Sequence, residues 1–518
     1  MFKMVAGGGW AMFKDLTVSD LRDESRLAGW AEVLARPASE TEAAELVRHC
    51  AGRGLGLTAQ GARTGLVGAA VPFGGWVVSS GALAGPTGLG LRPDGNLELT
   101  VRPGYSLAEL RRDLNRRRFD WAGPPPGDPR ARGALAERPW FWPPDPSEET
   151  ATLGGLASTK AGGPGALKFG SVARHIAGLR VILADGRPRE FRRGAGSSLA
   201  RGRLKMPAGP SLDLNQAALG LDPGAEALDI FIGGQGMFGL ITELTLLLRP
   251  RPAATWGLAL FFGDESGAAA FLDQARGLAP DALTALDYLD EAALAAVAEL
   301  KNLAAKLREI PDPPAGARAM VQVELQAGTE AEVEEAAGLL MAAAEAAGGD
   351  LDQSWALAGD EMEKLRLFRH AVPEALNGRL DQLRLKDPEV LKTGGDMTWP
   401  GFTPAEALAR FRADLAAAGL AAVVFGHVGA GGPWHVNFLP EDEYQRTRAR
   451  GLLWNWLLLA RAQGGRLFQE HGVGKTKRDL FQACEAPAVK SAWRAVKAIL
   501  DPGGLFNPGN MFAGEDGP

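Results

Sequence analysis

Hydrophobic and polar residues follow two different patterns along the chain. In the first half, short apolar runs with the two-residue period of a β-strand alternate with glycine-rich loops. The helical period occurs at 41–53, and Ser106 and Glu109 form a capping box for a helix that continues to Arg118. Strands are predicted at 55–58, 75–79, 176–184 and 240–248.

The pattern changes at a proline-rich segment near residue 252, where we place a domain boundary. Beyond it, Ala-rich sequence predicts long helices at 291–307 and 332–346, and another helix at 444–463 ends at two glycines. Strands are predicted between them, at 320–326, 421–425 and 436–439. Helices and strands alternate without a repeat of fixed length, which indicates an α+β fold.

Composition and charge exclude several classes of protein. The chain has 518 residues, 46% hydrophobic and 23% charged, which suits a folded protein of about two to four domains. A formal net charge of -6 provides no field that would hold nucleic acid. Two cysteines are too few for a disulfide framework or for an iron–sulfur cluster with four Cys ligands. No apolar stretch reaches the roughly 20 residues of a membrane span, and no signal peptide is evident, so we expect a cytoplasmic protein.

Two segments imitate nucleotide-binding motifs. Residues 234–239, GQGMFG, match the dinucleotide fingerprint, but a β-type sequence follows them where the fingerprint requires a helix. Residues 471–476, HGVGKT, imitate a phosphate-binding P-loop, but the first glycine that this motif requires would be residue 469, which is Gln469. The sequence therefore favours neither a nicotinamide site nor an ATP site.

Three of the six histidines lie close together in the sequence. His427, His435 and His471 fall within 45 residues, together with Glu470, in glycine-flanked segments at strand ends. Two imidazoles and one glutamate would give a divalent metal three protein ligands and an open position, the arrangement of a catalytic rather than a structural site.

Six glycine-containing segments carry a family resemblance, and they occur in the family's order from about residue 40 to residue 512. With them the chain resembles the FAD-linked oxidases of the vanillyl-alcohol oxidase or p-cresol methylhydroxylase type. It is most similar to the branch of D-lactate dehydrogenase, D-2-hydroxyglutarate dehydrogenase and the FAD subunit of glycolate oxidase. The segments are QGARTGLVGAAVP, PPDPSEETATLGGLASTKAGGPGALKFGSVARHIAGLRVILADG, GGQGMFGLITE, GHVGAGGPWHVN, QEHGVGKTKR and DPGGLFNPGNMF.

The resemblance implies a particular α+β architecture. We expect a two-part FAD-binding domain of the p-cresol methylhydroxylase type at 1–252. A substrate- and metal-binding cap domain with an antiparallel sheet is expected at 253–500. The tail at 501–518 is expected to pack back on the FAD domain.

FAD is the implied cofactor. Successive backbone N–H groups in the glycine-rich QGARTG segment can cradle a pyrophosphate without a helix dipole. No histidine lies between Leu55 and Pro72, where some relatives attach the flavin covalently, so the FAD is expected to be dissociable. The implied contacts are Gln60, Gly61, Ala62, Arg63, Thr64, Gly65 and Gly68 for the pyrophosphate, Pro144, Asp145, Thr152, Gly154, Gly155 and Ser158 for the flavin and ribityl chain, and Gln235, Ile241 and Asn507. Arg63, Lys160 and Gln235 replace the family's usual glycine, asparagine and glutamate.

The resemblance assigns a metal site to part of the histidine cluster. His427, His435 and Glu470 are the implied ligands of a divalent metal such as Zn, Mn or Fe. The family usually shows GHxGDGNxH, whereas here the two histidines are one residue further apart, with Ala430 in place of aspartate and Pro433 inserted nearby. A longer loop can still bring both rings to one ion, because added loop length has a small entropic cost.

Catalytic roles also follow from the resemblance. His471 is the implied base, and Arg369 is expected to pair with a substrate carboxylate through its planar guanidinium. Lys392 is a second, weaker candidate for that role.

The implied reaction is oxidation of a D-2-hydroxy acid, such as D-lactate, glycolate or 2-hydroxyglutarate, to the 2-oxo acid. His471 would take the hydroxyl proton while hydride passes from Cα to flavin N5. Because the chain lacks cluster cysteines, the electrons require a separate acceptor: an iron–sulfur subunit, an electron-transfer flavoprotein, a quinone or a cytochrome. Such an acceptor would also hold the protein at the inner face of the membrane.

Two alternatives remain open at the level of the sequence. A flavin-dependent transferase resembling alkylglycerone-phosphate synthase would share the fold without net oxidation, but that group tends to have histidine where this chain has Glu470. A flavin-binding subunit of a larger complex, without turnover of its own, is favoured by the altered loop between His427 and His435 and disfavoured by the presence of Glu470 and His471.

Overall fold

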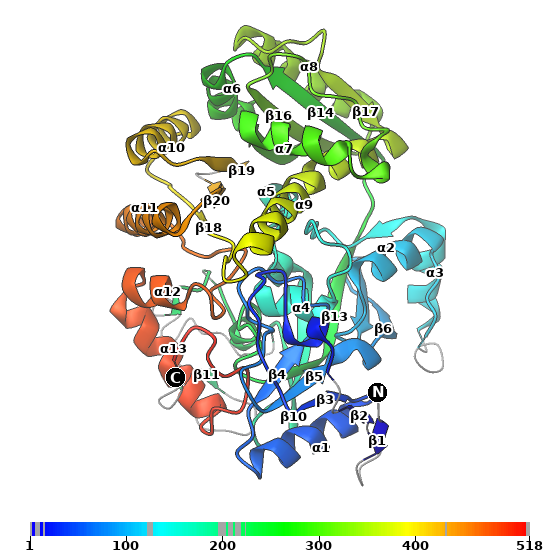
Figure 1. Ribbon diagram of the computed structural model, residues 1–518. Coiled ribbons are helices and arrows are strands. Elements are labelled where there is room, and N and C mark those ends of the chain that lie inside the picture. Colours follow the sequence, from blue (N-terminus) through cyan, green and yellow to red (C-terminus); the bar gives the residue numbers. More distant parts are fainter. Residues whose placement is uncertain are drawn as a thin grey trace. The chain divides into compact units, whose positions relative to one another are not determined.

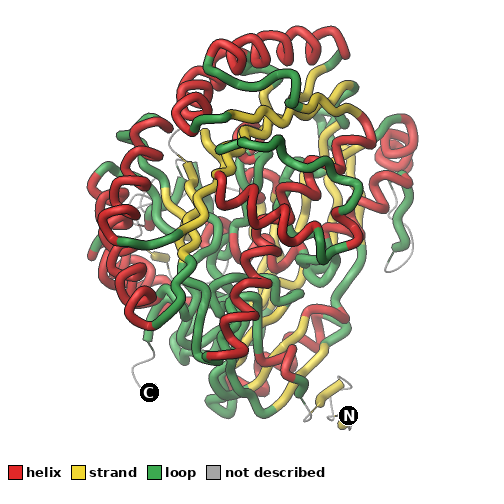
Figure 2. The backbone as a smooth tube through the Cα atoms, turned by 45° about the horizontal axis from the view of Figure 1, so that its top comes forward, coloured by secondary structure: helices red, strands yellow, loops and turns green. Residues whose placement is uncertain are grey.

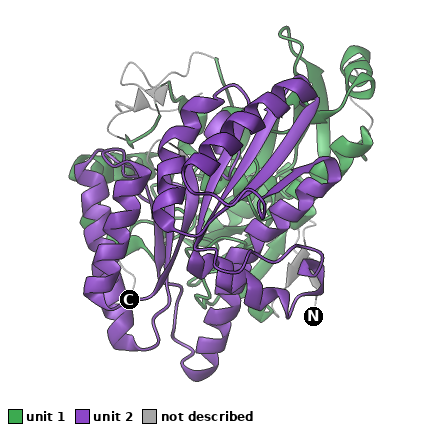
Figure 3. Ribbon diagram, turned by 90° about the horizontal axis from the view of Figure 1, so that it is seen from above, with its two compact units in different colours: residues 1–161, 171–251, 471–518 green, residues 162–170, 252–470 purple. Residues whose placement is uncertain are grey.

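The computed structural model describes residues 3–5, 11–13, 16–121, 128–194, 204–205, 211–212, 219–222, 224–429 and 432–513. The chain mixes helices and strands throughout, in agreement with the α+β class (Figure 2). It forms two compact units (Figure 3). Unit 1 comprises 1–161, 171–251 and 471–518, and unit 2 comprises 162–170 and 252–470.

The C-terminal segment that belongs to unit 1 begins earlier than expected. It starts at His471 rather than at residue 501. Helices α12 (Arg478–Cys484) and α13 (Pro487–Leu500) belong to this segment, and Trp493 of α13 stacks on the buried ring of Phe238 in unit 1. The apolar face of α13 therefore packs on the rest of unit 1. The boundary predicted from the change in hydrophobic pattern did not reveal this packing.

Three neighbouring strands in one sheet of unit 1 are parallel, and the last of them forms an edge of the sheet. Helix α1 (Glu40–Ala51) connects two of them, is capped by Ser39, and buries its apolar face. The tail extends the edge of this sheet, because Leu57 N–H donates to Leu505 O (2.7 Å) and Asn507 N–H donates to Leu57 O (2.8 Å). The strand order is β1 (Lys3–Val5), β2 (Ala11–Phe13), β3 (Val33–Arg36), β5 (Trp76–Ser79) and β4 (Leu57–Gln60), with β3, β5 and β4 parallel.

The second sheet of unit 1 is antiparallel. Its long strand follows directly on the segment GQGMFG, where the dinucleotide fingerprint would require a helix, as the β-type sequence predicted. The order is β10 (Pro188–Arg192), β9 (Ile176–Ile182), β13 (Leu240–Pro250), β7 (Leu97–Val101) and β6 (Pro86–Leu91), and β8 (Trp140–Phe141) also pairs with β13.

Short helices complete the described part of unit 1. The predicted capping box at Ser106 and Glu109 is present at the start of α2 (Leu107–Arg116), whose buried residues include Leu107, Leu110 and Leu114. The other elements are α3 (Pro129–Glu137), α4 (Leu153–Thr159), the 3-10 helices η1 (Val18–Leu21), η2 (Ser80–Ala82), η3 (Val172–His175) and η6 (Ala227–Ile230), and the strand pair β11 (Leu204–Lys205) and β12 (Ser211–Leu212).

Unit 2 is built on one antiparallel sheet (Figure 1). Alternate residues of its strands face opposite sides. In β14, a Cβ added at Gly257 would touch Leu365 and Met362 of α9, whereas the ring of Phe262 packs on Phe271 of α6. The order is β17 (Trp355–Ala358), β14 (Ala254–Phe262), β16 (Ala319–Ala327), β15 (Leu283–Asp290), β19 (Ala422–Gly429), β20 (Gly432–Phe438) and β18 (Gly394–Met397).

Helices cover both faces of this sheet, so its central strands are buried. Among the described residues, no helix is both long and apolar enough to cross a membrane. The helical elements are α5 (Ala166–Phe169), α6 (Glu265–Leu278), α7 (Glu291–Lys301), η7 (Ala305–Leu307), α8 (Glu330–Ala346), η8 (Gly359–Glu361), α9 (Met362–Lys386), α10 (Pro404–Ala418) and α11 (Glu443–Ala462).

Candidate functional site

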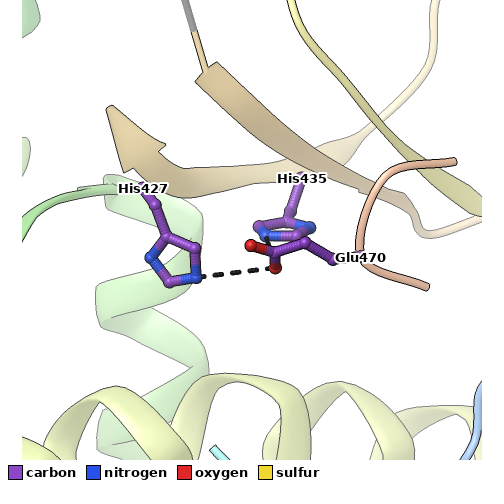
Figure 4. A group of neighbouring side chains, drawn as sticks. All are labelled: His427, His435 and Glu470. Carbon is purple, nitrogen blue, oxygen red and sulfur yellow. Dashed lines mark ion pairs between the residues drawn. The ribbon is translucent and has the colours of Figure 1, made fainter. Parts of the chain in front are cut away.

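Unit 2 brings His427, His435 and Glu470 together (Figure 4). Oε2 of Glu470 lies 3.3 Å from His435 Nε2 and 3.7 Å from His427 Nε2. The two imidazole centroids are 5.5 Å apart. One potential ligand atom of each residue lies within 4.8 Å of the others. Both histidines are buried, and the glutamate side chain is mostly buried.

Strand register positions the two imidazoles. His427 lies on β19 opposite Asp287 of β15, and His435 lies on β20 between Phe425 of β19 and Asp396 of β18. Because hydrogen-bonded ladders fix each pair, the longer connection between the strands does not separate the rings. Ala430, one of the departures from the family pattern, lies outside the described residues.

A buried carboxylate orients His427. Nδ1 of His427 bonds to Oδ1 of Asp287, and Oδ2 of Asp287 pairs with Nε of Arg369. Nη2 of Arg369 also lies 2.8 Å from His427 Nε2. An N–H can donate to Nε2 only if that nitrogen carries no proton, so the contacts select the tautomer with the proton on Nδ1. In this tautomer the Nε2 lone pair accepts the Arg369 N–H, and a metal ion bound at Nε2 would replace that donor.

Asp287 stays ionised despite its surroundings. Burial alone would raise the pKa of Asp287, but the charge of Arg369 and the contact with His427 outweigh burial and lower it. A charged Asp287 is the partner that a metal-binding imidazole commonly has on its second nitrogen.

Two features position Glu470. Its N–H donates to Oδ2 of Asp396 at 2.8 Å, just beyond a bridge between Met397 and Leu467. Its carboxylate lies against Gly162, where an added Cβ would stand 2.5 Å from Glu470 Oε1. The absence of a side chain at residue 162 therefore leaves the space that the carboxylate occupies.

The donor chemistry of this cluster suits a divalent metal. Two imidazole nitrogens and one carboxylate oxygen are ligands that Zn, Mn and Fe accept, and three protein ligands leave a coordination position for a small molecule. The Nδ1–Asp287 bond supplies the outer partner that such a site requires.

The structure separates the remaining catalytic candidates. Arg369 lies at the cluster, whereas Nζ of Lys392 donates to Asn377 Oδ1 at 3.1 Å. Asn377 is eight residues beyond Arg369 on the same helix, which corresponds to about 12 Å. Lys392 lines a small, mostly apolar pocket there rather than the cluster. His471 directly follows Glu470 in the chain and is the first residue of the C-terminal segment of unit 1.

Unit 1 brings together four segments that carry most of the predicted FAD contacts. A Cβ added at Gly61 would stand 2.2 Å from Oγ1 of Thr152, so the loop after β4 closely approaches the start of α4. Gln235 N–H donates to Ser158 O (2.8 Å). Oδ1 of Asn507 accepts Ala59 N–H (2.9 Å), which ties the tail to the strand before the loop.

Backbone conformation marks these segments as specialised. Among the described residues, eight non-glycine residues have positive φ, and five of them lie in these segments: Arg63, Lys160, Gln235, Asn507 and Met511. Such conformations are uncommon outside glycine and cluster at functional sites. Arg63 (φ 63°) and Lys160 (φ 55°) replace glycine and asparagine of the family pattern, the two residue types that adopt this conformation most easily.

A buried polar atom adds to this description. Gln60 is 2% exposed, and its Nε2 donates to Asp20 O and Ala70 O at 2.8 Å each. Its Oε1 accepts no hydrogen bond from the described part of the chain. A buried acceptor of this kind, in a strained glycine loop, fits a site for a polar ligand such as a dinucleotide.

The other predicted FAD contacts also lie in unit 1. Asp145, which follows the buried Pro144, forms an ion pair with Arg111 of α2. Ile241 is buried on β13, opposite Val181. Ala62, Thr64, Gly65 and Gly68 belong to the loop after β4, and Gly154 and Gly155 to the first turn of α4.

Sequence reasoning missed Asp287, Asp396 and Gly162. A signal existed for Asp287, because an aspartate inside the apolar run LTALDYLD is unusual for a buried strand. Asp396 and Gly162 stand in glycine-rich segments where no periodic pattern distinguishes them.

Comparison with known proteins identifies the family of the chain. The protein-family model described as "FAD linked oxidases, C-terminal domain" matches residues 252–511. A second family model, described as "FAD binding domain", matches residues 31–134 and 128–192. The chain belongs to the family of FAD-linked oxidases and has an FAD-binding domain.

Individual relatives and one solved structure are similar to this chain over most of its length. The chain is 26% identical over 522 residues to a D-lactate dehydrogenase of Anaerostipes hadrus, covering 98% of this chain and 96% of the relative. It is 25% identical over 481 residues to the mitochondrial D-2-hydroxyglutarate dehydrogenase of Rattus norvegicus, covering 93% and 78%. The structure of 4-ethylphenol oxidase from Gulosibacter chungangensis has the same fold, with a TM-score of 0.64 and 16% identity over 95% of this chain and 92% of that one.

Proposed function

We propose that this FAD-linked oxidoreductase converts a small D-2-hydroxy acid to the 2-oxo acid and passes the electrons to a separate acceptor. The observation that carries the proposal is the His427, His435 and Glu470 cluster with Arg369 beside it, in a chain whose relatives include D-lactate and D-2-hydroxyglutarate dehydrogenases. A 2-hydroxy acid has a hydroxyl and a carboxylate on neighbouring carbons, and the cluster combines metal-ligand chemistry with a cation.

His427, His435 and Glu470 would hold a divalent cation. The cation, when bound, supplies a Lewis acid that lowers the pKa of an alcohol. Asp287 fixes the tautomer of His427, and Asp396 fixes the backbone of Glu470. The chain thus orients two of the three ligands before any ion arrives, which reduces the entropic cost of binding.

Arg369 would bind the substrate carboxylate. Its guanidinium has five N–H donors, and the contacts to Asp287 and His427 involve Nε and Nη2. Its side chain is only 11% exposed, and hydrogen bonds between ions strengthen where water is excluded. Lys392 has no part in this proposal, because it lies against Asn377 further along α9.

His471 would accept the proton of the substrate hydroxyl. It is bonded in sequence to Glu470, so the chain itself keeps a base next to a metal ligand. An imidazole titrates near neutral pH and suits this role. FAD, when bound, supplies a two-electron acceptor. Because the chain has only two cysteines, both buried, reoxidation requires an acceptor outside it, such as an iron–sulfur protein, an electron-transfer flavoprotein, a quinone or a cytochrome.

Anaerobic mixing with a panel of D- and L-2-hydroxy acids tests the proposal. The purified protein is loaded with FAD and with Zn, Mn or Fe in turn, and flavin absorbance is followed. We expect bleaching by at least one D-2-hydroxy acid and not by its L-enantiomer. If FAD-loaded, metal-loaded protein is bleached by none of them, the proposal is wrong, and a transferase or a flavin-binding subunit without turnover becomes the better description.

A further inference from the structure

Lys475 belongs to the segment HGVGKT, which the sequence does not favour as a P-loop, and the proposed reaction gives it no role. In unit 1 its backbone is anchored to the loop after β4, since the N–H groups of Lys475 and Thr476 donate to Val67 O at 2.9 and 3.1 Å. Gly474 makes this approach possible, because a Cβ there would stand 2.1 Å from Val67 O. Lys475 is therefore held beside the glycine loop that ends at Gly68.

The ammonium of Lys475 has neutral partners. Its Nζ donates to Asn510 Oδ1 at 2.7 Å and to Gly68 O at 3.5 Å, and it forms no ion pair with a carboxylate among the described residues. Lys497 of the same unit differs, because its Nζ lies 2.6 Å from Asp501 Oδ2. Lys475 is thus a partly buried cation without a close counter-charge.

The charged groups around Lys475 are Asp23 and Arg478. Burial lowers the pKa of Lys475 to about 8, Asp23 opposes this decrease, and Arg478 adds to it. Asp23 is itself 5% exposed, and burial raises its pKa to about 6. A cation that burial destabilises to this degree would be stabilised by an additional anion nearby.

Hydrogen bonds from side chains, that of Lys475 among them, hold the carbonyl groups of the loop. Gly68 O accepts from Lys475, Ala69 O accepts from Nδ2 of both Asn507 and Asn510, and Ala70 O accepts from Gln60. Lys475 therefore belongs to the set of side chains that hold residues 68–70 of the loop in one conformation.

We propose that Lys475 is the counter-charge for the pyrophosphate of FAD and that it sets how tightly unit 1 binds the cofactor. The proposal rests on the FAD-binding domain of the family and not on the oxidation proposed above. The glycine loop supplies neutral N–H donors, and Lys475 supplies the positive charge that these donors lack.

The test compares ligands with and without the pyrophosphate. Apoprotein is titrated with FAD and with riboflavin by flavin fluorescence, and with ADP by competition against FAD, in the wild type, Lys475→Met, Lys475→Arg and Lys490→Met. Lys490 is the matched control, a partly buried lysine of the same unit whose Nζ donates to one carbonyl, Gln482 O.

Lys475→Met should weaken FAD and ADP binding by a similar factor of about 10 to 100, the scale of one lost hydrogen bond to a charged group. Riboflavin affinity should be unchanged, Lys475→Arg should retain most of the FAD affinity, and Lys490→Met should behave as the wild type. FAD binding should also depend less on salt in Lys475→Met, because one charge interaction is missing.

Equal losses for FAD and riboflavin would show that Lys475 only shapes the loop and would overturn the proposal, as would an FAD affinity within twofold of the wild type. If Lys475→Met does not fold, Lys475→Gln tests the same charge with a polar side chain. Failure of both uncharged variants to fold, with Lys475→Arg folded, assigns the residue to stability and also overturns the proposal. None of these readouts involves substrate, so they are independent of the hydroxy-acid panel.

Discussion

The two candidate sites of this chain are built in different ways. In unit 1, backbone conformation and amide side chains form the site, through the positive φ of Arg63, the contacts of Asn507 and the close approach of Gly61 to Thr152. In unit 2, charged side chains on paired strands form the site, and Asp287 and Arg369 support it with ionic bonds.

This difference explains which departures from the family pattern each site tolerates. A site made by the backbone can change side chains, as at Arg63 and Lys160, provided that the new residues adopt the same φ at a small cost in strain. A site made by side chains on strands can change the loop between His427 and His435, because register rather than loop length places the rings.

The two sites also treat buried carboxylates differently. Burial raises the pKa of Asp23 in unit 1 to about 6. In unit 2, burial acts on Asp287 in the same direction, but Arg369 and His427 lower its pKa. The partners of Asp287 thus favour its charged form, whereas Asp23 has mainly neutral partners and destabilises the fold when it ionises.

The largest expected effect is complete loss of FAD in Gly155→Arg. A Cβ at residue 155 would meet only Thr152 Oγ1, at 3.2 Å, so unit 1 should fold while the long charged side chain displaces the flavin. Flavin absorbance after gel filtration and thermal unfolding of the apoprotein measure the two effects. Gly155→Ala is the control and should retain FAD. An Arg variant with full flavin content would show that α4 does not contact the flavin.

Glu470→Gln should lower metal content and flavin reduction together, by about 100-fold in the reduction rate. The amide keeps the size of the side chain but removes the charge between the two histidines. Elemental analysis and stopped-flow absorbance measure the two quantities. Excess metal should restore part of the rate, because mass action can refill a weakened site.

His471→Asn separates the base from the metal ligands. We expect wild-type metal and FAD content with flavin reduction slowed by about 100-fold or more, the usual scale for loss of a general base. Added metal should not restore the rate, since it cannot replace a proton acceptor. Wild-type reduction in both this variant and Glu470→Gln would place the chemistry elsewhere.

Asp287→Asn should weaken metal binding by about 10- to 100-fold, the range observed when the outer partner of a metal-binding histidine is removed. The amide no longer selects the tautomer of His427 or balances Arg369. Titration with Zn or Mn measures the affinity. Asp290→Asn is the control, because Asp290 is buried on the same strand but pairs with Arg412. Equal metal affinity in the wild type and Asp287→Asn would assign Asp287 to stability alone.

Gly162→Ala should weaken metal binding by about tenfold with little change in the free energy of unfolding. The added methyl group would stand 2.5 Å from Glu470 Oε1, the end of a flexible side chain that can move aside and thereby leave its ligand position. Gly338→Ala is the control, since an added Cβ meets nothing within 4 Å there. A variant with normal metal affinity would mean that Glu470 ligates from another rotamer.

The smallest expected effect is on the pH dependence of stability in Asp23→Asn. A folded-state pKa of about 6, raised from 3.8, means that Asp23 contributes most stability below pH 3.8 and that this contribution is lost as pH rises through about 6. The asparagine variant should therefore be more stable than the wild type by about 1–2 kcal/mol at pH 8, and the difference should shrink toward pH 4. Urea unfolding of the apoprotein at both pH values measures it, and a pH-independent difference would contradict the raised pKa.

Local elements followed well from the sequence. Helix α1, the capping box of α2, and strands β9, β13 and β16 lie within a few residues of their predicted bounds, because periodicity, caps and turn residues act between neighbours in the chain. The prediction that a strand and not a helix follows residues 234–239 was also correct, since β13 begins at Leu240. The histidines and glutamate of unit 2 could be found because they are rare residue types in one short window.

By itself, the sequence determined the α+β class, the family of FAD-linked oxidases and the residue types at the two sites, because motif order and local periodicity are properties of neighbouring residues. Only the tertiary structure decided that Asp287, 140 residues before His427, orients that imidazole, and that Gly162 leaves space for Glu470. It also decided that Lys392 lies with Asn377, away from the cluster. These contacts depend on strand register and packing between segments far apart in the chain, and local sequence patterns do not specify them.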